Sequence, residues 1–212
     1  LYQTDREKFV KYNAFFEKFV YALSFTLYTT AAICITSFLK LYTDGVDDVS
    51  YIDNYLPYLF FLLRILSTVR VPMGNIIGYA QKNRETLNRA LIEAGINLFS
   101  TIILVFVWGI HGAVIGTIVA LFYRTNDMII YGNHRLLDRS CKKSYFRIFI
   151  HIPTCIVSLI IGYLLNFSTN SYFDWIVYAL IVFSIQALFN FAIFFLSEKE
   201  VRKDCIEFIK NV

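Results

Sequence analysis

The sequence is short of charge. Asp, Glu, Lys and Arg make up only 17% of its 212 residues, whereas 57% are apolar and 18% are aromatic. Soluble domains commonly have about a quarter of their residues charged. Together with a mean hydropathy of +0.55, this composition excludes an ordinary soluble domain and predicts an integral membrane protein.

Patterns typical of catalysis and metal binding are also absent. The four cysteines form no CxxC or histidine-spaced pair, so the sequence predicts neither a metal site nor a disulfide framework; they are Cys34, Cys141, Cys155 and Cys205. There is no nucleotide-binding loop, no nucleophile motif and no carboxylate pair in a catalytic context. We therefore expect no enzyme, no cofactor and no nucleic-acid partner.

The start of the sequence lacks both an initiator methionine and a signal peptide. Its first residues, "LYQTDREKFVKYNAFF", are charged and resemble the middle of a longer chain. We expect this sequence to be a fragment.

Six long apolar runs dominate what is present. They are continuous and far exceed the roughly 9–11 residues of a barrel strand, so they predict membrane-spanning helices of about 20 residues each. The expected fold class is an all-α membrane protein with six transmembrane helices. The expected spans are Phe19–Leu39, about Tyr55–Ala80, Ala90–Trp108, about Ala113–Tyr131, Tyr145–Leu165 and Tyr172–Leu196, with a tight "GIHG" turn between the third and fourth.

Lysine and arginine are segregated among the connections. Sixteen lie in the amino-terminal arm, the second and fourth connections and the tail, counting Arg147 just inside the fifth span with the fourth connection, while the other three connections hold one lysine between them. Because cytoplasmic loops are enriched in these residues, both ends should lie in the cytoplasm, with the chain in the cell membrane. We expect a cytoplasmic arm (residues 1–18), a six-helix transmembrane domain (19–196) and a tail (197–212). The tail is either a surface-lying amphipathic helix or a frayed terminus.

Two arginines lie inside the second predicted span, "YLFFLLRILSTVRVPMGNIIGYA". An arginine at mid-bilayer costs roughly 2.5–3.5 kcal/mol on insertion scales, so something must compensate. Arg64 should lie near mid-membrane, and Arg70 about 9 Å closer to the cytoplasm at 1.5 Å per residue. Pro72 predicts a kink between Thr68 and Pro72, and a kinked helix that carries cations typically lines a cavity. For Arg70, snorkelling to the inner surface is the alternative.

Other polar residues interrupt the later spans. Arg124 and Asp127 either form a self-neutralising i,i+3 pair or serve transport. Glu93 shares one helix face with Asn97 and Ser100, which favours either a polar seam between helices or a role in ion coupling. For His151, a packing role competes with a proton relay. Glu93, Asp127 and His151 are therefore the candidates for coupling to H⁺ or Na⁺.

The region "VPMGNIIGYAQKNRETLNRALIEAGINLFSTIILVFVWGIHGAVIGTIVA", Val71–Ala120, resembles the carboxy-terminal half of bacterial polysaccharide flippases of the Wzx type. These belong to the multidrug/oligosaccharidyl-lipid/polysaccharide (MOP) exporter superfamily. The matching features are a small-residue helix end, a short basic loop with a threonine, a helix with Glu93 and Asn97, a tight Gly turn, and a G-x-x-G-A-x-x-G-T run.

The resemblance implies one six-helix lobe of a two-lobe transporter, with an amino-terminal lobe preceding Leu1. It implies alternating-access transport of an anionic lipid-linked oligosaccharide for cell-surface polysaccharide synthesis. Arginines suit pyrophosphate oxygens, so we expect Arg64, Arg70 and Arg124 to bind substrate. A peptidoglycan lipid-precursor flippase, a multidrug exporter and a non-transporting scaffold subunit are the alternatives.

Overall fold

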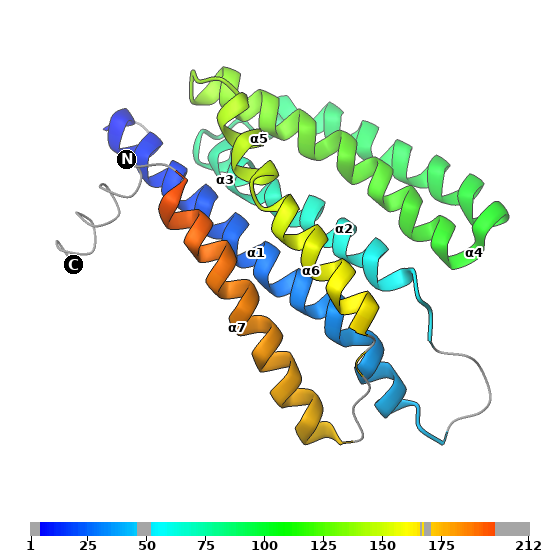
Figure 1. Ribbon diagram of the computed structural model, residues 1–212. Helices are drawn as coiled ribbons and strands as arrows, with labels where there is room; N and C mark the ends of the chain where they lie inside the picture. Colours follow the sequence, from blue (N-terminus) through cyan, green and yellow to red (C-terminus); the bar gives the residue numbers. More distant parts are fainter. Residues whose placement is uncertain (1–4, 46–51, 166, 168–170, 198–212) are drawn as a thin grey trace.

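The computed structural model describes residues 5–45, 52–165, 167 and 171–197, and in that part of the chain every regular element is helical (Figure 1). The predicted amphipathic tail lies outside the described residues from position 198 onward. The elements are α1 (Arg6–Tyr42), α2 (Leu56–Val69), α3 (Val71–Tyr79), the short helix η1 (Asn83–Thr86), α4 (Leu87–Tyr131), the short helix η2 (Gly132–Leu136), α5 (Lys142–Phe149), α6 (Ile152–Leu165) and α7 (Tyr172–Leu196).

Helix α1 begins well before the first predicted span. The side chain of Asp5 caps it by accepting a hydrogen bond from the Lys8 backbone N–H at 3.1 Å. The helix then continues without a break through residues assigned to the cytoplasmic arm. Most of that arm is therefore the first part of a 37-residue helix rather than a separate segment.

Two prolines interrupt apolar helical segments, and each break lies just before the proline. Proline lacks an N–H and clashes with the carbonyl four residues earlier. Pro72 accordingly separates α2 from α3 at Arg70, which confirms the predicted kink. Pro153 has the same effect on the fifth predicted span, which is divided into α5 and α6 at Ile150 and His151.

Helix α4 is a hairpin of two helical halves. Gly109 interrupts it with φ 54° and ψ −129°, a conformation that only glycine adopts readily. Beyond this residue the second half packs back against the first. A side chain at Gly112 would meet the Leu104 carbonyl oxygen at 1.9 Å, so the two backbones are in direct contact there. The tight turn predicted at "GIHG" is thus confirmed.

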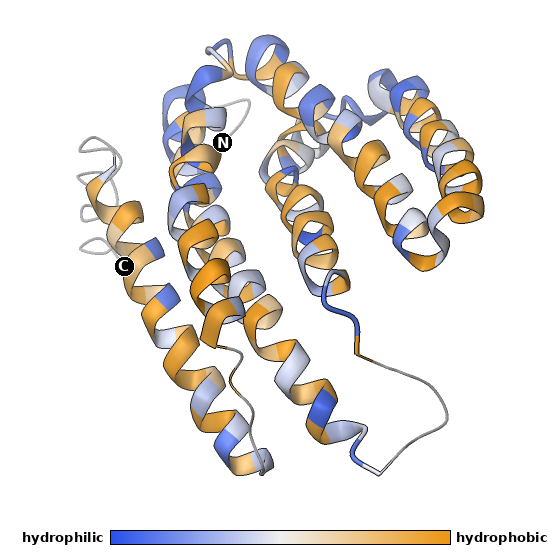
Figure 2. Cartoon of the chain, turned by 45° about the vertical axis from the view of Figure 1, so that its right-hand side comes forward, coloured by the Kyte–Doolittle hydropathy of each residue, from blue (hydrophilic) through white to orange (hydrophobic). Residues whose placement is uncertain are grey.

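The helices pack around α1, which contacts α7 on one side and α2 on the other, while α2 also contacts the α4 hairpin. Between α1, α2 and α6 lies a buried cluster of Tyr21, Phe25, Ile65, Val69 and Cys155. Hydrophobic residues dominate most of the helices (Figure 2), and many of their large apolar side chains are exposed. Exposed apolar side chains on long helices suit contact with lipid.

Five helical segments are long and apolar enough to cross a membrane: Arg6–Tyr42, Leu56–Tyr79, Asn83–Leu136, Lys142–Leu165 and Tyr172–Leu196. The third of these has 54 residues and contains the reversal at Gly109. The chain is therefore all-helical over its described part, with five segments suited to a membrane by length and composition.

Candidate functional site

Four of the five charged residues predicted within the spans lie together. The Nη1 atom of Arg70, at the break between α2 and α3, is 2.7 Å from Oε1 of Glu93 in the first half of α4. Arg124, in the second half of α4, reaches Asp127 at 2.9 Å and Glu93 at 3.5 Å. The predicted Arg124–Asp127 pair is confirmed, and it is one part of a larger network that connects three helical segments.

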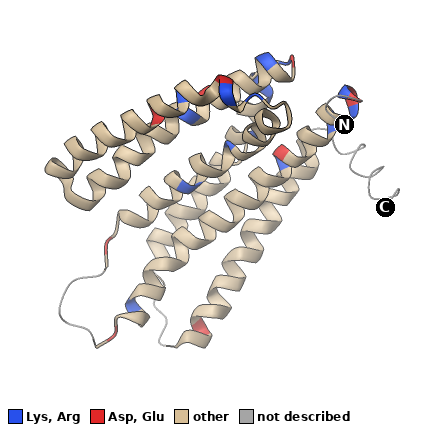
Figure 3. Ribbon diagram, turned by 180° about the vertical axis from the view of Figure 1, so that it is seen from behind, with Lys and Arg blue, Asp and Glu red and all other residues tan. Residues whose placement is uncertain are grey.

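Arg89 completes this network, although the sequence suggested only that it lies in a basic loop. Its Nη1 atom is 2.8 Å from Oδ1 of Asp127. Three arginines therefore share two carboxylates, which leaves one positive charge in excess. We call these five residues the α4 charge network: Arg70, Arg89, Glu93, Arg124 and Asp127. On the ribbon of the hairpin, the positions of charged residues lie away from the reversal at Gly109 (Figure 3).

An open pocket of about 420 Å³ borders the network. Its polar wall includes Arg70, Glu93, Arg124 and Asn75, and Met128 forms part of the rest. The Arg70 side chain is 27% exposed to solvent, and the Arg124 side chain is 9% exposed. An excess positive charge beside a pocket of this size favours an anionic group over a cationic one.

The polar seam predicted on α4 is present in part. The Oγ of Ser100 donates to the Gly116 carbonyl at 3.0 Å, and the Asn97 side-chain oxygen accepts from Thr101 and Thr117. These contacts join the two halves of the hairpin. Glu93 does not take part in them, because it faces the two arginines.

Arg64 lies apart from the α4 charge network. Its side chain is exposed and, among the described residues, it has no ion pair or hydrogen bond. It lines a second pocket of about 420 Å³ whose remaining lining is almost wholly apolar. That lining comes from α1, α2 and the residues before α2: Tyr28, Ala31, Ala32, Ile35, Leu39, Asp53, Leu56, Pro57, Phe60 and Phe61.

His151 lies in neither pocket. It is 3% exposed at the break between α5 and α6, stacks on Phe25 and has its Nδ1 atom 2.8 Å from the Asn190 side-chain oxygen. In the described part of the chain no carboxylate pairs with it. This environment is the one expected of a packing histidine that is satisfied by an amide.

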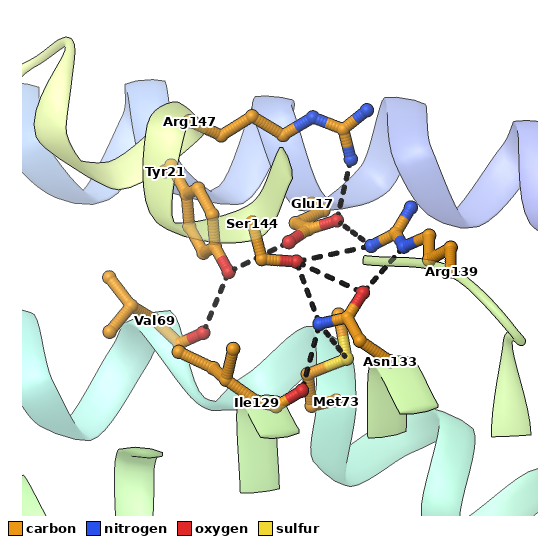
Figure 4. A network of polar contacts seen from close by, with 9 residues as sticks. All are labelled: Glu17, Tyr21, Val69, Met73, Ile129, Asn133, Arg139, Ser144 and Arg147. Atoms are coloured by element: carbon orange, nitrogen blue, oxygen red, sulfur yellow. Dashed lines mark hydrogen bonds and ion pairs between the residues drawn. The ribbon is translucent and has the colours of Figure 1, made fainter. Parts of the chain in front are cut away.

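A buried network centred on Glu17 was not foreseen (Figure 4). The Glu17 side chain is fully buried, and its Oε2 atom accepts hydrogen bonds from Arg139 at 2.6 Å and from Arg147 at 2.7 Å. The Tyr21 hydroxyl lies 3.2 Å from its Oε1 atom. Arg139 is also held by the Asn133 side chain at 2.5 Å.

The Glu17 network joins α1 to η2, to α5 and to the residues between them. The sequence places Glu17 in the arm and Arg139 in the fourth connection, and it predicts no contact between them. The pairing residues are 122 and 130 positions from Glu17 in the sequence. No local pattern connects them, so only the fold could reveal this contact.

In the part of the chain that the structure describes, no group of three or more His, Cys, Asp or Glu side chains could hold a metal ion. Comparison with known proteins gives no match to any protein-family model, curated protein or solved structure. The arginines are the groups best placed to bind a ligand. Arg64, unpaired among the described residues, lies in the wall of an apolar pocket, and the α4 charge network places an excess positive charge beside a second, more polar pocket.

Proposed function

We propose that this chain is part of a membrane transporter that moves an anionic lipid-linked oligosaccharide across the cytoplasmic membrane by alternating access. The observation that carries the proposal is Arg64, a permanent cation without a protein partner in the wall of an apolar pocket. A lone arginine in such surroundings is costly unless water or a ligand solvates it. An anionic head group would pair with Arg64, and its attached lipid chain would contact the apolar lining of the pocket.

The α4 charge network supports an anionic substrate in a second way. Three arginines against two carboxylates leave a net positive charge beside its pocket. Arg70 and Arg124 bind substrate in this proposal, although their acidic partners already offset much of their charge. Glu93 and Asp127 remain the candidates for coupling to H⁺ or Na⁺.

The proposal includes six membrane crossings with both ends in the cytoplasm. Each half of α4 then crosses once, and the reversal at Gly109 lies on the outer side. The segregation of lysine and arginine in the sequence supports this orientation. The Wzx-type resemblance adds a preceding lobe of the same protein as the partner of this one.

Three other functions are alternatives to transport of a lipid-linked oligosaccharide. A peptidoglycan lipid-precursor flippase would share the pyrophosphoryl head group. A multidrug exporter of organic cations would suit acidic cavity residues better than the arginines found here. A non-transporting scaffold subunit is favoured by the pairing of Arg70 and Arg124 with acids, and it is disfavoured by the unpaired Arg64.

Replacement of Arg64 tests the proposal. In proteoliposomes that contain the full-length protein, Arg64→Gln should lower the rate at which a pyrophosphoryl-linked oligosaccharide becomes accessible to an impermeant lectin by at least about tenfold, the loss expected for one charge-assisted contact. Arg84→Gln, at an exposed position on η1, is the control and should transport normally. Transport by Arg64→Gln at the unmodified rate would refute the assignment.

Cysteine labelling gives an independent test. On a background without the native cysteines, a cysteine at position 64 should react with a charged, membrane-impermeant thiol reagent, and pyrophosphoryl-lipid substrate should slow that reaction. A folded protein whose position 64 reacts from neither side would place this residue outside any hydrated pocket.

A further inference from the structure

A single histidine–carboxylate contact connects the tip of the α4 hairpin to the start of α2. The Nε2 atom of His111, two residues beyond the reversal at Gly109, lies 2.9 Å from Oδ2 of Asp53. Both side chains are about one-third exposed. Glu93 lies sixteen residues before Gly109, about 24 Å along the helix, so this contact is far from the α4 charge network.

Asp53 is firmly attached to α2. Its Oδ1 atom accepts hydrogen bonds from the backbone N–H groups of Tyr55 at 2.7 Å and Leu56 at 2.9 Å, which caps the start of the helix. The hydrogen bond from Leu56, followed by that from Tyr55, holds the pKa of the Asp53 carboxyl below its ordinary value. Asp53 is therefore ionised throughout the range in which histidine titrates.

The strength of the contact depends on whether the His111 ring is charged. The His111 Nε2 atom is shielded from solvent, and among the described residues it has no aligned hydrogen-bond partner. Protonation of the ring makes this 2.9 Å contact an ion pair, whereas a neutral ring leaves a weaker contact with the carboxylate. A histidine ordinarily changes charge between about pH 5 and 8.

The same aspartate lines the pocket of Arg64. Asp53 and Arg64 are both in its wall, and Arg64 lies eight residues beyond Leu56, about 12 Å along α2. A contact that fixes Asp53 to the α4 hairpin thus also fixes one end of this pocket. Its release would remove one restraint between the start of α2 and the α4 hairpin.

We propose that Asp53 and His111 form a proton-controlled contact that fixes the start of α2, at one end of the pocket of Arg64, to the α4 hairpin and loosens when His111 loses its proton. The inference rests on the proposed function, for which it names the residues that make access depend on pH. It assigns this role to a histidine other than His151.

Few other groups compete for His111. On α2, the helix packed against α4 at this end, the titratable and charged side chains are Tyr58 and Arg64. The remaining elements packed against α4 lie at its opposite end, and their titratable and charged side chains are Tyr79, Arg84, Glu85, His134 and Arg135. Among the residues that the structure describes, Asp53 is the carboxylate that contacts His111.

The charges of Asp53 and His111 determine whether the contact strengthens or weakens as the pH rises. The contact is strongest where Asp53 is ionised, as its lowered pKa favours, and the His111 ring is charged. It weakens when the ring is neutral. The pocket should therefore open on going from pH 5.5 to pH 8.

Spin labels on exposed positions measure the contact directly. Tyr55 and Trp108 are 73% and 55% exposed on either side of it. With both replaced by labelled cysteines in the full-length, otherwise cysteine-free protein, the inter-label distance should lengthen between pH 5.5 and pH 8. His111→Asn and Asp53→Asn should abolish that change. The control is His134→Asn, an exposed histidine on η2, which should retain it.

Access to the pocket provides the second measurement. The labelling rate of a cysteine at position 64 should rise by up to about fivefold between pH 5.5 and pH 8, the effect expected from loss of one partly exposed ion pair. His111→Asn should be fast at both values.

A label distance that does not change with pH, or that still changes in His111→Asn, would overturn this inference and leave the transport result for Arg64→Gln unaffected. Normal transport by Arg64→Gln would instead refute the proposed function, and the distance measurement would still decide whether the contact responds to protons.

Discussion

At the scale of single residues, the arginines in and beside the apolar helices fall into two groups. Arg139 and Arg147 share the fully buried Glu17, and Arg70 and Arg124 share Glu93. Arg64 has no such partner among the described residues. The contrast separates cations that stabilise the fold from one that is available to a ligand.

Glu17 should be one of the most sensitive positions for stability. Glu17→Gln removes the negative charge shared by Arg139 and Arg147, and an uncompensated buried charge typically costs about 3–5 kcal/mol. We expect the free energy of unfolding, measured by SDS titration in mixed micelles, to fall by about that amount.

The control for Glu17 is Glu7→Gln, on the same helix at an exposed position, which should change stability by less than about 0.5 kcal/mol. Equal effects of the two substitutions would mean that the buried network contributes nothing specific to stability.

At the scale of elements, the sequence predicted chain breaks better than it predicted contacts. Pro72 and Gly109 act through the local backbone, so a break at each was predicted from residue type. Pro153 acts in the same way, but the expected span Tyr145–Leu165 was continuous, and the break at Ile150 and His151 was not predicted. The approach of Arg70 to Glu93 depends on how α2 packs against α4, which no local pattern specifies.

The α4 hairpin offers a sharp test of close helix packing. At Gly112 an added Cβ would overlap backbone atoms of Leu104 and Val105, which cannot move without separating the two halves. Gly112→Ala should therefore destabilise the protein by about 1–3 kcal/mol, the usual cost of overpacking, and lower its thermal midpoint in detergent.

Gly95→Ala is the matched control on the same helix, because nothing lies within 4 Å of the added Cβ. It should be neutral or stabilise the protein by about 0.5–1 kcal/mol, since alanine is the better helix former. A smaller loss at position 112 than at position 95 would contradict the hairpin packing.

At the scale of the whole molecule, composition alone indicated a helical membrane protein, and the five apolar segments agree with it. The number of crossings depends on α4. Its 54-residue segment from Asn83 to Leu136 is too long for one crossing, since about 20 residues span the hydrocarbon core. The reversal at Gly109 leaves two geometries: a hairpin that crosses twice, or one that enters and leaves without reaching the far side.

Single cysteines distinguish the two geometries. Ile110, beside the reversal, is 62% exposed, and both Arg84 and His134, at the open end of the hairpin, are exposed as well. In intact cells that express the full-length, otherwise cysteine-free protein, a cysteine at 110 should react with an impermeant thiol reagent added outside. Cysteines at 84 and 134 should react only after the cells are opened.

This pattern would establish that each half of α4 crosses the membrane, which gives six spans, and the lysine and arginine distribution would then have predicted the orientation correctly. If position 110 also required opened cells, the hairpin would stop short of the outer surface. Asp53 and His111 would then face the interior of the membrane or the cytoplasm, and protons would have to reach them from that side.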